Sequence, residues 1–245
     1  MRTVLAAIAA CLAAGLAVST EAGRPCAAPG REVGAILPPA AIVKLRSERE
    51  LRIVSFGSSS TQGVGASSPT KTYPAQLDAI LERRLPGRAI EVVNAGVGGE
   101  TVEDNMRRLD SVLRLRPDLV IWQVGTNDAL RGVAPDRVRV ELLEGVRRIE
   151  ARGAEVVLMD PQPLQSPEEE RAIAAMSGAI GEAARETRTP LFPRHALMRQ
   201  WLRSGEFTSA SLYVGDGLHM TDAGYRCLAE DLADALVPES AASVR

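Results

Sequence analysis

The chain contains few aromatic residues, few lysines and few histidines. Aromatic residues account for 3% of its 245 positions, Lys occurs only at positions 44 and 71, and there are two His. So few aromatic side chains leave little material for a platform on which sugar rings can stack. The formal net charge is -2, and the Arg residues are scattered among Asp and Glu, which is typical of solvated helix faces. The composition therefore gives no sign of a nucleic-acid partner.

The sequence also lacks the spacings of common metal and nucleotide sites. Asp104, Asp128 and Asp160 have no His near them at ligand spacing. Residues 57–65 are rich in Gly and Ser, but no Gly-Lys-Ser/Thr follows them, which excludes a P-loop. Residues 96–99 lack the glycine spacing of a dinucleotide fold. We predict no metal and no cofactor.

A long apolar run is present only at the N-terminus. Arg2 gives a positive start, residues 4–18 are rich in Ala and Leu, and residues 20–22 are suited to signal peptidase cleavage. We predict a signal peptide at 1–22 and a periplasmic or secreted protein. The alternatives are an uncleaved anchor, a buried helix, or lipidation at a lipoprotein-like box at 8–11. Cleavage is favoured because the run is short for a membrane span.

Three cysteines are present, and Cys11 falls within the predicted signal peptide. Cys26 and Cys227 remain, which is an even number in an exported chain. A disulfide between them would tie the mature N-terminus to the last helix. The alternative is two unpaired thiols. Neither cysteine has the spacing of a metal ligand.

Residues 23–50 are rich in Pro, Gly and charge and are interpreted as a leader segment, with a short helix near 40–49. From residue 51 onward the chain alternates between apolar strand patterns and helical patterns. The predicted strands are 52–56, 90–93, 119–124, 155–159 and 191–192, and the predicted helices are 73–85, 101–115, 135–152, 167–188 and 221–236. This alternation predicts one α/β domain at 51–245, a three-layer α/β/α sandwich with a mostly parallel, flavodoxin-like sheet of about five strands.

Polar segments follow three of the predicted strands and precede the last helix. They are residues 57–63 (GSSSTQG), 94–101 (NAGVGGET), 125–128 (GTND) and 216–219 (DGLH). The carboxyl ends of parallel strands form the binding edge of such a sheet. In order and position, these segments resemble the four signature blocks of the SGNH hydrolases, also called the GDSL esterase/lipase family. The resemblance covers most of the chain after the predicted signal peptide.

A serine hydroxyl becomes a nucleophile when a neighbouring base accepts its proton. Of the two predicted mature histidines, only His219 has a carboxylate three residues upstream, Asp216. The resemblance implies Ser59 as nucleophile, His219 as general base and Asp216 as the acid that fixes the imidazole tautomer. A histidine making ordinary hydrogen bonds is the alternative for His219. His195 has no acidic residue near it in sequence and is interpreted as a surface or satisfied core histidine.

Acyl transfer also requires donors directed at the oxyanion. The resemblance implies the backbone N–H groups of Ser59 and Gly99 and the side-chain amide of Asn127. Gly96 or Gly98 takes the glycine role if the alignment shifts, and these glycines can instead form a tight turn. For Asn127 the alternative is a turn residue that bonds its own backbone.

Two features of the nucleophile segment depart from known patterns. Ser58 stands where the family usually has Asp in Gly-Asp-Ser, which leaves the local hydrogen bonds in question. Thr61 occupies the final Gly position of a Gly-x-Ser-x-Gly elbow, and this argues against the α/β-hydrolase fold.

The resemblance and the predicted export indicate a serine esterase that removes short acyl groups, such as O-acetyl, from cell-envelope or extracellular carbohydrate. The expected partner is a small-molecule or polysaccharide ester, without nucleic acid. The alternatives within the same chemistry are a lipase, thioesterase or lysophospholipase, and an O-acyltransferase. An inactive carbohydrate-binding relative is the alternative from another class, and Ser58 in place of Asp is its only support.

Overall fold

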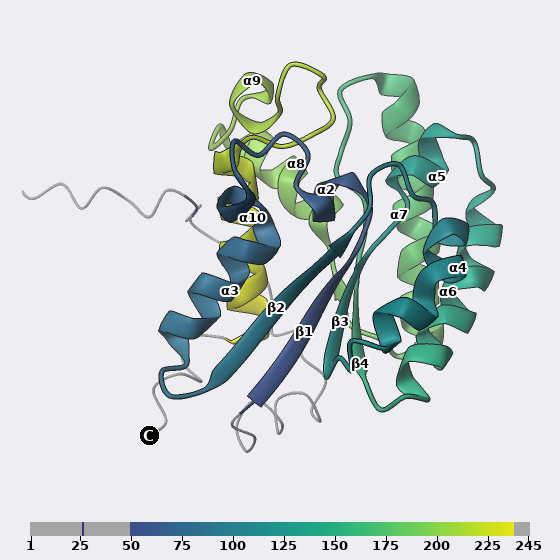
Figure 1. Cartoon of the computed structure of the whole chain (residues 1–245). Helices are drawn as coiled ribbons and strands as arrows, with labels where there is room; N and C mark the ends of the chain where they lie inside the picture. Colours follow the sequence, from purple (N-terminus) through teal and green to yellow (C-terminus); the bar gives the residue numbers. More distant parts are fainter. Residues whose placement is uncertain (1–25, 27–49, 238–245) are drawn as a thin grey trace, which may run out of the picture.

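A computed structural model describes Cys26 and residues 50–237 of the chain (Figure 1). The predicted signal peptide, the predicted helix near 40–49 and the last residues lie outside the described part. Among the described helices, none has the length and apolar character needed to cross a bilayer.

Five parallel strands form one sheet in the order β2-β1-β3-β4-β5. They are β1 (Glu50–Gly57), β2 (Ala89–Gly96), β3 (Leu119–Gln123), β4 (Glu155–Met159) and β5 (Leu191–Phe192). This confirms the predicted flavodoxin-like α/β sheet. After β1, the chain forms β2 on one side of β1 and then returns to form β3 on the opposite side of β1. Ligand sites in such sheets lie at the carboxyl ends of the strands, where the order reverses.

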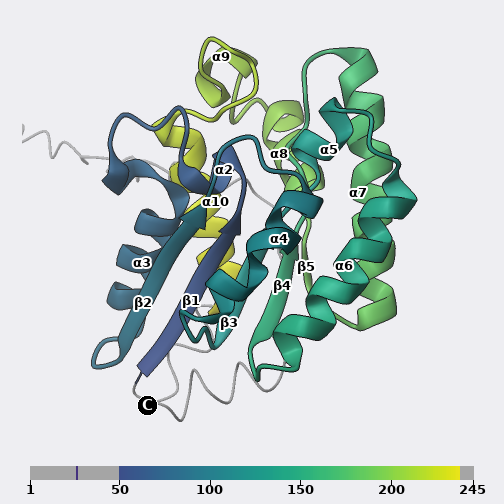
Figure 2. The same cartoon turned by 45° about the vertical axis from the view of Figure 1, so that its right-hand side comes forward.

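Helices cover both faces of the sheet (Figure 2). They are α2 (Ser59–Gln62), α3 (Tyr73–Arg84), α4 (Val102–Leu113), α5 (Thr126–Leu130), α6 (Pro135–Glu150), α7 (Pro167–Thr187), α8 (Arg194–Ser204), α9 (Ser209–Leu212) and α10 (Asp222–Leu236), with a 3-10 helix η1 (Pro69–Lys71).

The buried central strand explains how one sheet supports two cores. In β3, Leu119 and Ile121 pack with α3, α8 and α10, whereas Val120 and Trp122 pack with α4, α6 and α7. Successive side chains of a strand point to opposite faces, so a strand that is apolar at every position serves both layers. The three-layer arrangement follows from this pattern.

The structure contains four helices, α2, α5, α8 and α9, that the sequence did not indicate. The segments α2, α5 and α9 have four or five residues each, too few for a 3.6-residue periodicity to be recognised. The helix α8 begins directly after β5 at Arg194, a buried charged residue that interrupts the apolar pattern. Of these four helices, α2 and α5 begin at or beside predicted site residues.

A disulfide joins Cys26 to Cys227 of α10, with their Cα atoms 5.1 Å apart. Both residues are buried in the core under α3 and α10. Of the two alternatives left open by the sequence, the structure has the bonded pair. The bond closes a loop of about two hundred residues, and such long loops lose much conformational entropy in the unfolded state.

Candidate active site

The nucleophile segment lies where β1 ends and α2 begins. Three serines are adjacent there, but Ser58 and Ser60 are only 4% and 2% exposed. Ser59 is half-buried and is the first residue of α2. Sequence alone can distinguish these three serines only by alignment. In the structure, their burial distinguishes them, because Ser59 has the one accessible hydroxyl of the three.

Ser58 makes a local contact in place of the family's Asp. Its backbone N–H and its hydroxyl both donate to the side-chain oxygen of Gln123, each at 3.1 Å. Thr61 Oγ1 donates to the same oxygen at 3.2 Å. The loop after β1 is therefore fastened to the end of β3 by an amide oxygen.

His219 contacts Ser59 on one side and Asp216 on the other. Ser59 Oγ lies 2.8 Å from His219 Nε2, and Asp216 Oδ2 lies 2.6 Å from His219 Nδ1. An ionised carboxylate only accepts, so Nδ1 carries the proton and Nε2 is free to accept from the Ser59 hydroxyl. In this arrangement the imidazole can take the serine proton, as a general base does.

A tight antiparallel turn carries Asp216 and His219. The N–H of Val214 donates to His219 O at 2.8 Å, and Tyr213 pairs with Met220 in an antiparallel bridge. Gly65 fits closely against this turn, since a Cβ there would lie 2.6 Å from Met220 O and 3.2 Å from His219 Cβ. Glycine at position 65 therefore lets the first loop reach the histidine.

The side chain of Asp216 is 47% exposed, and its surroundings favour the charged form. Desolvation acts to raise its pKa. The His219 ring and the N–H groups of His219 and Leu218, each 2.9 Å from Oδ1, outweigh desolvation and lower the pKa below its usual range. The carboxylate can therefore stabilise a positive imidazolium.

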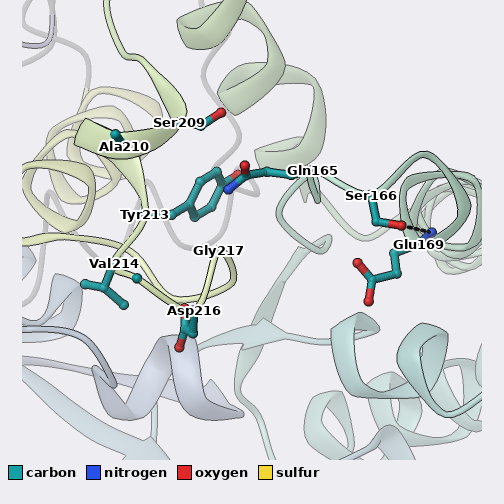
Figure 3. Close-up of a pocket in the computed structure, with 10 residues that line it drawn as sticks. Gln165, Ser166, Glu169, Ser209, Ala210, Tyr213, Val214, Asp216 and Gly217 are labelled. Atoms are coloured by element: carbon teal, nitrogen blue, oxygen red, sulfur yellow. Dashed lines mark hydrogen bonds between the residues drawn. The ribbon is translucent and has the colours of Figure 1, made fainter.

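A pocket of about 640 Å³ opens beside Asp216 and Gly217 (Figure 3). The start of α7, including Gln165 before it, and the helix α9 form the rest of its wall. A second pocket of about 590 Å³ lies along the β2 edge near Gln62 and Val64.

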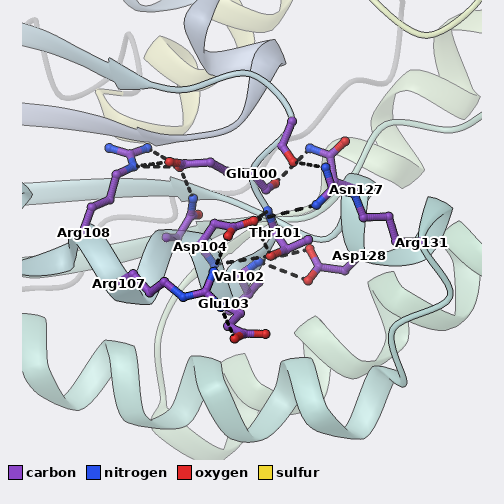
Figure 4. Close-up of polar contacts among 12 residues, drawn as sticks. Glu100, Thr101, Val102, Glu103, Asp104, Arg107, Arg108, Asn127, Asp128 and Arg131 are labelled. Carbon is purple, nitrogen blue, oxygen red and sulfur yellow. Dashed lines mark hydrogen bonds and ion pairs between the residues drawn. The ribbon is translucent and has the colours of Figure 1, made fainter.

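Two residues of α5 and the turn after it hold the loop between β2 and α4 (Figure 4). The Asn127 amide donates to Glu100 O at 2.9 Å, and Arg131 donates to Gly99 O at 2.7 Å. Gly99 has φ +78°, a conformation that favours glycine. The N–H of Gly96 donates to the Asn94 side chain at 2.9 Å, so this N–H is not available to an oxyanion. Gly98 and Gly99 remain as candidates for the glycine N–H donor of the oxyanion site.

Arg108 of α4 also holds the loop between β2 and α4. It pairs with Glu100 at 2.6 Å and donates to Ala95 O at 2.9 Å and Gly57 O at 3.2 Å. Its guanidinium also lies over the Phe56 ring, 4.7 Å from the centroid. One cation thus joins the ends of β1 and β2 to the loop, and the sequence analysis did not identify this role.

Asp128 connects α5 to the first residue of α4. It is 2% exposed and accepts the Val102 N–H at 3.1 Å. Burial raises the pKa of Asp128 to about 6, with a further contribution from Glu141, while the Val102 N–H and Arg131 act to lower it. The hydrogen bond at the start of α4 therefore involves a carboxyl whose charge changes near pH 6.

A buried network behind the turn was also missed from the sequence. Arg194 is fully buried and donates to Asp160 O at 3.0 Å and Gln162 Oε1 at 2.5 Å. Gln162 in turn donates to Leu218 O at 3.3 Å, next to His219. These residues are distant in sequence, and only the fold brings them together.

His195 is engaged elsewhere. Its Nε2 lies 2.9 Å from Glu170 Oε1, so the fold supplies the acidic partner that the neighbouring sequence lacks. Its side chain is 12% exposed, which agrees with a satisfied histidine. Within the described residues, no three His, Cys, Asp or Glu side chains gather as a set of metal ligands.

Residues 25–242 match the model of the non-GDSL lipase-like family. Among curated proteins, the chain is similar to the esterase TesA of Pseudomonas aeruginosa, with 32% identity over 65% of this chain and 77% of that protein. It is also similar to an arylesterase of Vibrio mimicus, with 28% identity over 68% of this chain and 79% of the relative. The family match at residues 25–242 spans all four polar segments.

Solved structures share the fold. A TesA structure superposes with a TM-score of 0.64 at 27% identity and covers 77% of this chain and 99% of that one. A structure of Axe2, an acetylxylan esterase from Geobacillus stearothermophilus, superposes with a TM-score of 0.67 at 22% identity, covering 76% and 94% of the two chains.

Replacing Asn127 tests the oxyanion assignment. If its free amide N–H stabilises the oxyanion, Asn127→Ala should lower kcat about a hundred- to a thousandfold with little change in KM, because the donor acts in the transition state. Kinetics with 4-nitrophenyl acetate measure this, and a thermal melt checks that the variant is folded. A kcat within about threefold of wild type would remove Asn127 from the oxyanion site.

Replacing Asp128 tests the pH sensitivity of the α4–α5 joint. The folded pKa of about 6 lies above the ordinary value, so the carboxyl's contribution is complete at low pH and is lost as pH rises through 6. Asp128→Asn mimics the protonated form, so its stability relative to wild type should increase from pH 4.5 to pH 7.5 by about 2 kcal/mol. Urea unfolding at both pH values measures this.

Asp104→Asn is the matched control for this experiment. Hydrogen bonds from the Thr101 backbone and side chain lower the pKa of Asp104, so its contribution is lost as pH falls. That loss occurs below the ordinary Asp pKa of about 4, so the relative stability of Asp104→Asn should be nearly the same at pH 4.5 and pH 7.5. An Asp128→Asn difference that is the same at both pH values would contradict the assignment.

Proposed function

Because the chain belongs to the non-GDSL lipase-like family of SGNH hydrolases, whose relatives named above are esterases, we propose that it hydrolyses short acyl esters of carbohydrates through an acyl-Ser59 intermediate. The observation that carries the proposal is the continuous chain of contacts from Ser59 through His219 to Asp216, at 2.8 and 2.6 Å. It lies at the switch point of the sheet, where substrates reach parallel α/β folds.

The reaction proceeds in two steps. Ser59 Oγ attacks the ester carbonyl as His219 Nε2 takes the hydroxyl proton, and Asp216 stabilises the imidazolium. The bond from the carbonyl carbon to the alcohol oxygen then breaks, and His219 returns the proton to that oxygen. In the second step, water attacks the acyl carbonyl carbon as His219 takes a proton from it. The bond from that carbon to Ser59 Oγ then breaks, His219 returns the proton to Oγ, and the free acid leaves.

The negative charge that forms on the carbonyl oxygen requires donors in place before the reaction. Ser59 N–H, Gly99 N–H and the second N–H of the Asn127 amide are assigned this role. Support comes from the first Asn127 N–H, which is bound to Glu100 O at 2.9 Å and so fixes the direction of the second. Donors that are fixed by the fold do not need to reorganise during the reaction.

The proposal of a short acyl group on a carbohydrate rests on the predicted location of the protein. The predicted signal peptide places the enzyme in the periplasm or outside the cell, and a buried disulfide is compatible with that compartment. Ser58 keeps the first loop fastened to Gln123, so its presence does not by itself indicate an inactive relative.

A series of 4-nitrophenyl esters of increasing acyl length tests this proposal. The specificity constant kcat/KM should be highest for acetate and fall by about tenfold or more by octanoate, because an acyl site suited to a two-carbon group gives the added methylenes no favourable burial. Rising values with chain length would favour the lipase or thioesterase alternative. Transfer of acetyl to an added sugar would identify an acyltransferase, and absence of turnover would favour the binding protein.

A further inference from the structure

The pocket beside Asp216 has a composition that cleavage of an ester bond does not itself require. Three segments line it: the start of α7, the helix α9, and the turn that carries the Asp216 carboxylate. In Figure 3, Tyr213 and Gln165 lie between the α9 residues Ser209 and Ala210 and the acid Asp216. We propose that this pocket binds the alcohol part of the ester and selects neutral polyols over anionic leaving groups.

This inference rests on the proposed function, because it uses the direction of the leaving group in that reaction. His219 must return its proton to the alcohol oxygen, so the alcohol part departs on the His219 side of Ser59. The pocket is lined by Asp216 and Gly217, which belong to the same turn as His219. The alcohol part can therefore extend along the turn into the pocket.

The lining offers hydrogen-bonding groups that suit hydroxyls. Gln165 is exposed, and its side chain has no hydrogen-bond partner among the described residues. An amide both donates and accepts, and so does the hydroxyl of Ser209. Sugar hydroxyls also donate and accept, so they match this set. The pocket of about 640 Å³ falls within the size range of small-molecule sites.

The charge of the lining opposes anions. Glu169 and Asp216 contribute carboxylates, and neither Lys nor Arg is among the lining residues. Glu168 also lies in the first turn of α7, beside Glu169. Like charges raise the free energy of a bound phosphate or carboxylate. A lysophospholipid headgroup or a coenzyme A thiol carries phosphates, so this wall disfavours both of those leaving groups.

Tyr213 holds one side of the pocket in place. Tyr213 is 3% exposed, and its hydroxyl donates to Pro163 O at 2.7 Å. A Cβ on Gly217 would lie 3.2 Å from the Gln165 amide nitrogen, so the turn and Gln165 are neighbours. Groups that are already positioned lose less entropy on binding.

The test compares three acetyl donors: 4-nitrophenyl acetate, a monoacetylated glucose and acetyl coenzyme A. The ratio of kcat/KM for acetylglucose to that for 4-nitrophenyl acetate should fall about three- to tenfold in Gln165→Ala, because one hydrogen bond to the sugar is lost. The ratio for acetyl coenzyme A should rise about five- to tenfold in Glu169→Lys, and this gain should shrink at high salt.

Glu168→Lys is the matched control for charge reversal. Glu168 occupies the same exposed first turn of α7 but does not line the pocket, so the same change there should alter the acetyl coenzyme A ratio much less. Equal effects of the two reversals would indicate a general change in surface charge and would overturn the assignment of the pocket.

The outcomes separate the two proposals. A folded wild-type protein that cleaves none of the three donors contradicts the proposed function itself. Cleavage with ratios that do not respond to Gln165→Ala or Glu169→Lys leaves the esterase in place and overturns only the role of the pocket. A wild-type preference for acetyl coenzyme A over acetylglucose would also overturn it.

Discussion

The hydrogen bond between Ser59 and His219 joins residues that are 160 positions apart in the chain, and the other features of the site depend on that contact. It requires the loop after β1 to meet the turn before α10 above the sheet. Gly65 allows the close approach, and the Tyr225 hydroxyl holds Val64 O at 2.6 Å. The Cys26–Cys227 disulfide adds a covalent link to α10, which follows the turn. The geometry thus depends on how firmly α10 is fixed to the sheet.

The loop between β2 and α4 is fixed by charge as well as by packing. Arg108 and Glu100 form a partly buried pair, and Asp128 accepts a backbone N–H at the start of α4. Buried carboxylates usually cost stability unless their partners satisfy them. Here they lie next to the groups assigned to the oxyanion, Gly99 and Asn127. Burial of Asp128 therefore costs stability next to the oxyanion groups, where a rigid loop favours catalysis.

Periodicity was sufficient to predict the sheet and its main helices. The family resemblance carried by the polar segments supplied the prediction that Ser59, Asp216 and His219 meet at the edge of the sheet. The apolar run around Trp122 marked a strand buried on both faces, and glycine and proline marked most helix ends. Sequence did not identify the Arg194–Gln162 network or the Glu170 partner of His195, because those contacts depend on three-dimensional distance. Whether Cys26 and Cys227 were bonded was open for the same reason. Short helices such as α9 were not predicted, because four residues are too few to show a helical periodicity.

The most direct test of the account is to treat the purified protein with a serine-reactive fluorophosphonate probe and locate the modified residue by mass spectrometry. The account predicts one label, on Ser59, with labelling strongly slowed in His219→Ala because the hydroxyl loses its base. A label on Ser58 or Ser60, or a folded wild-type protein that does not react, would contradict the central claim that Ser59 and His219 act as a pair.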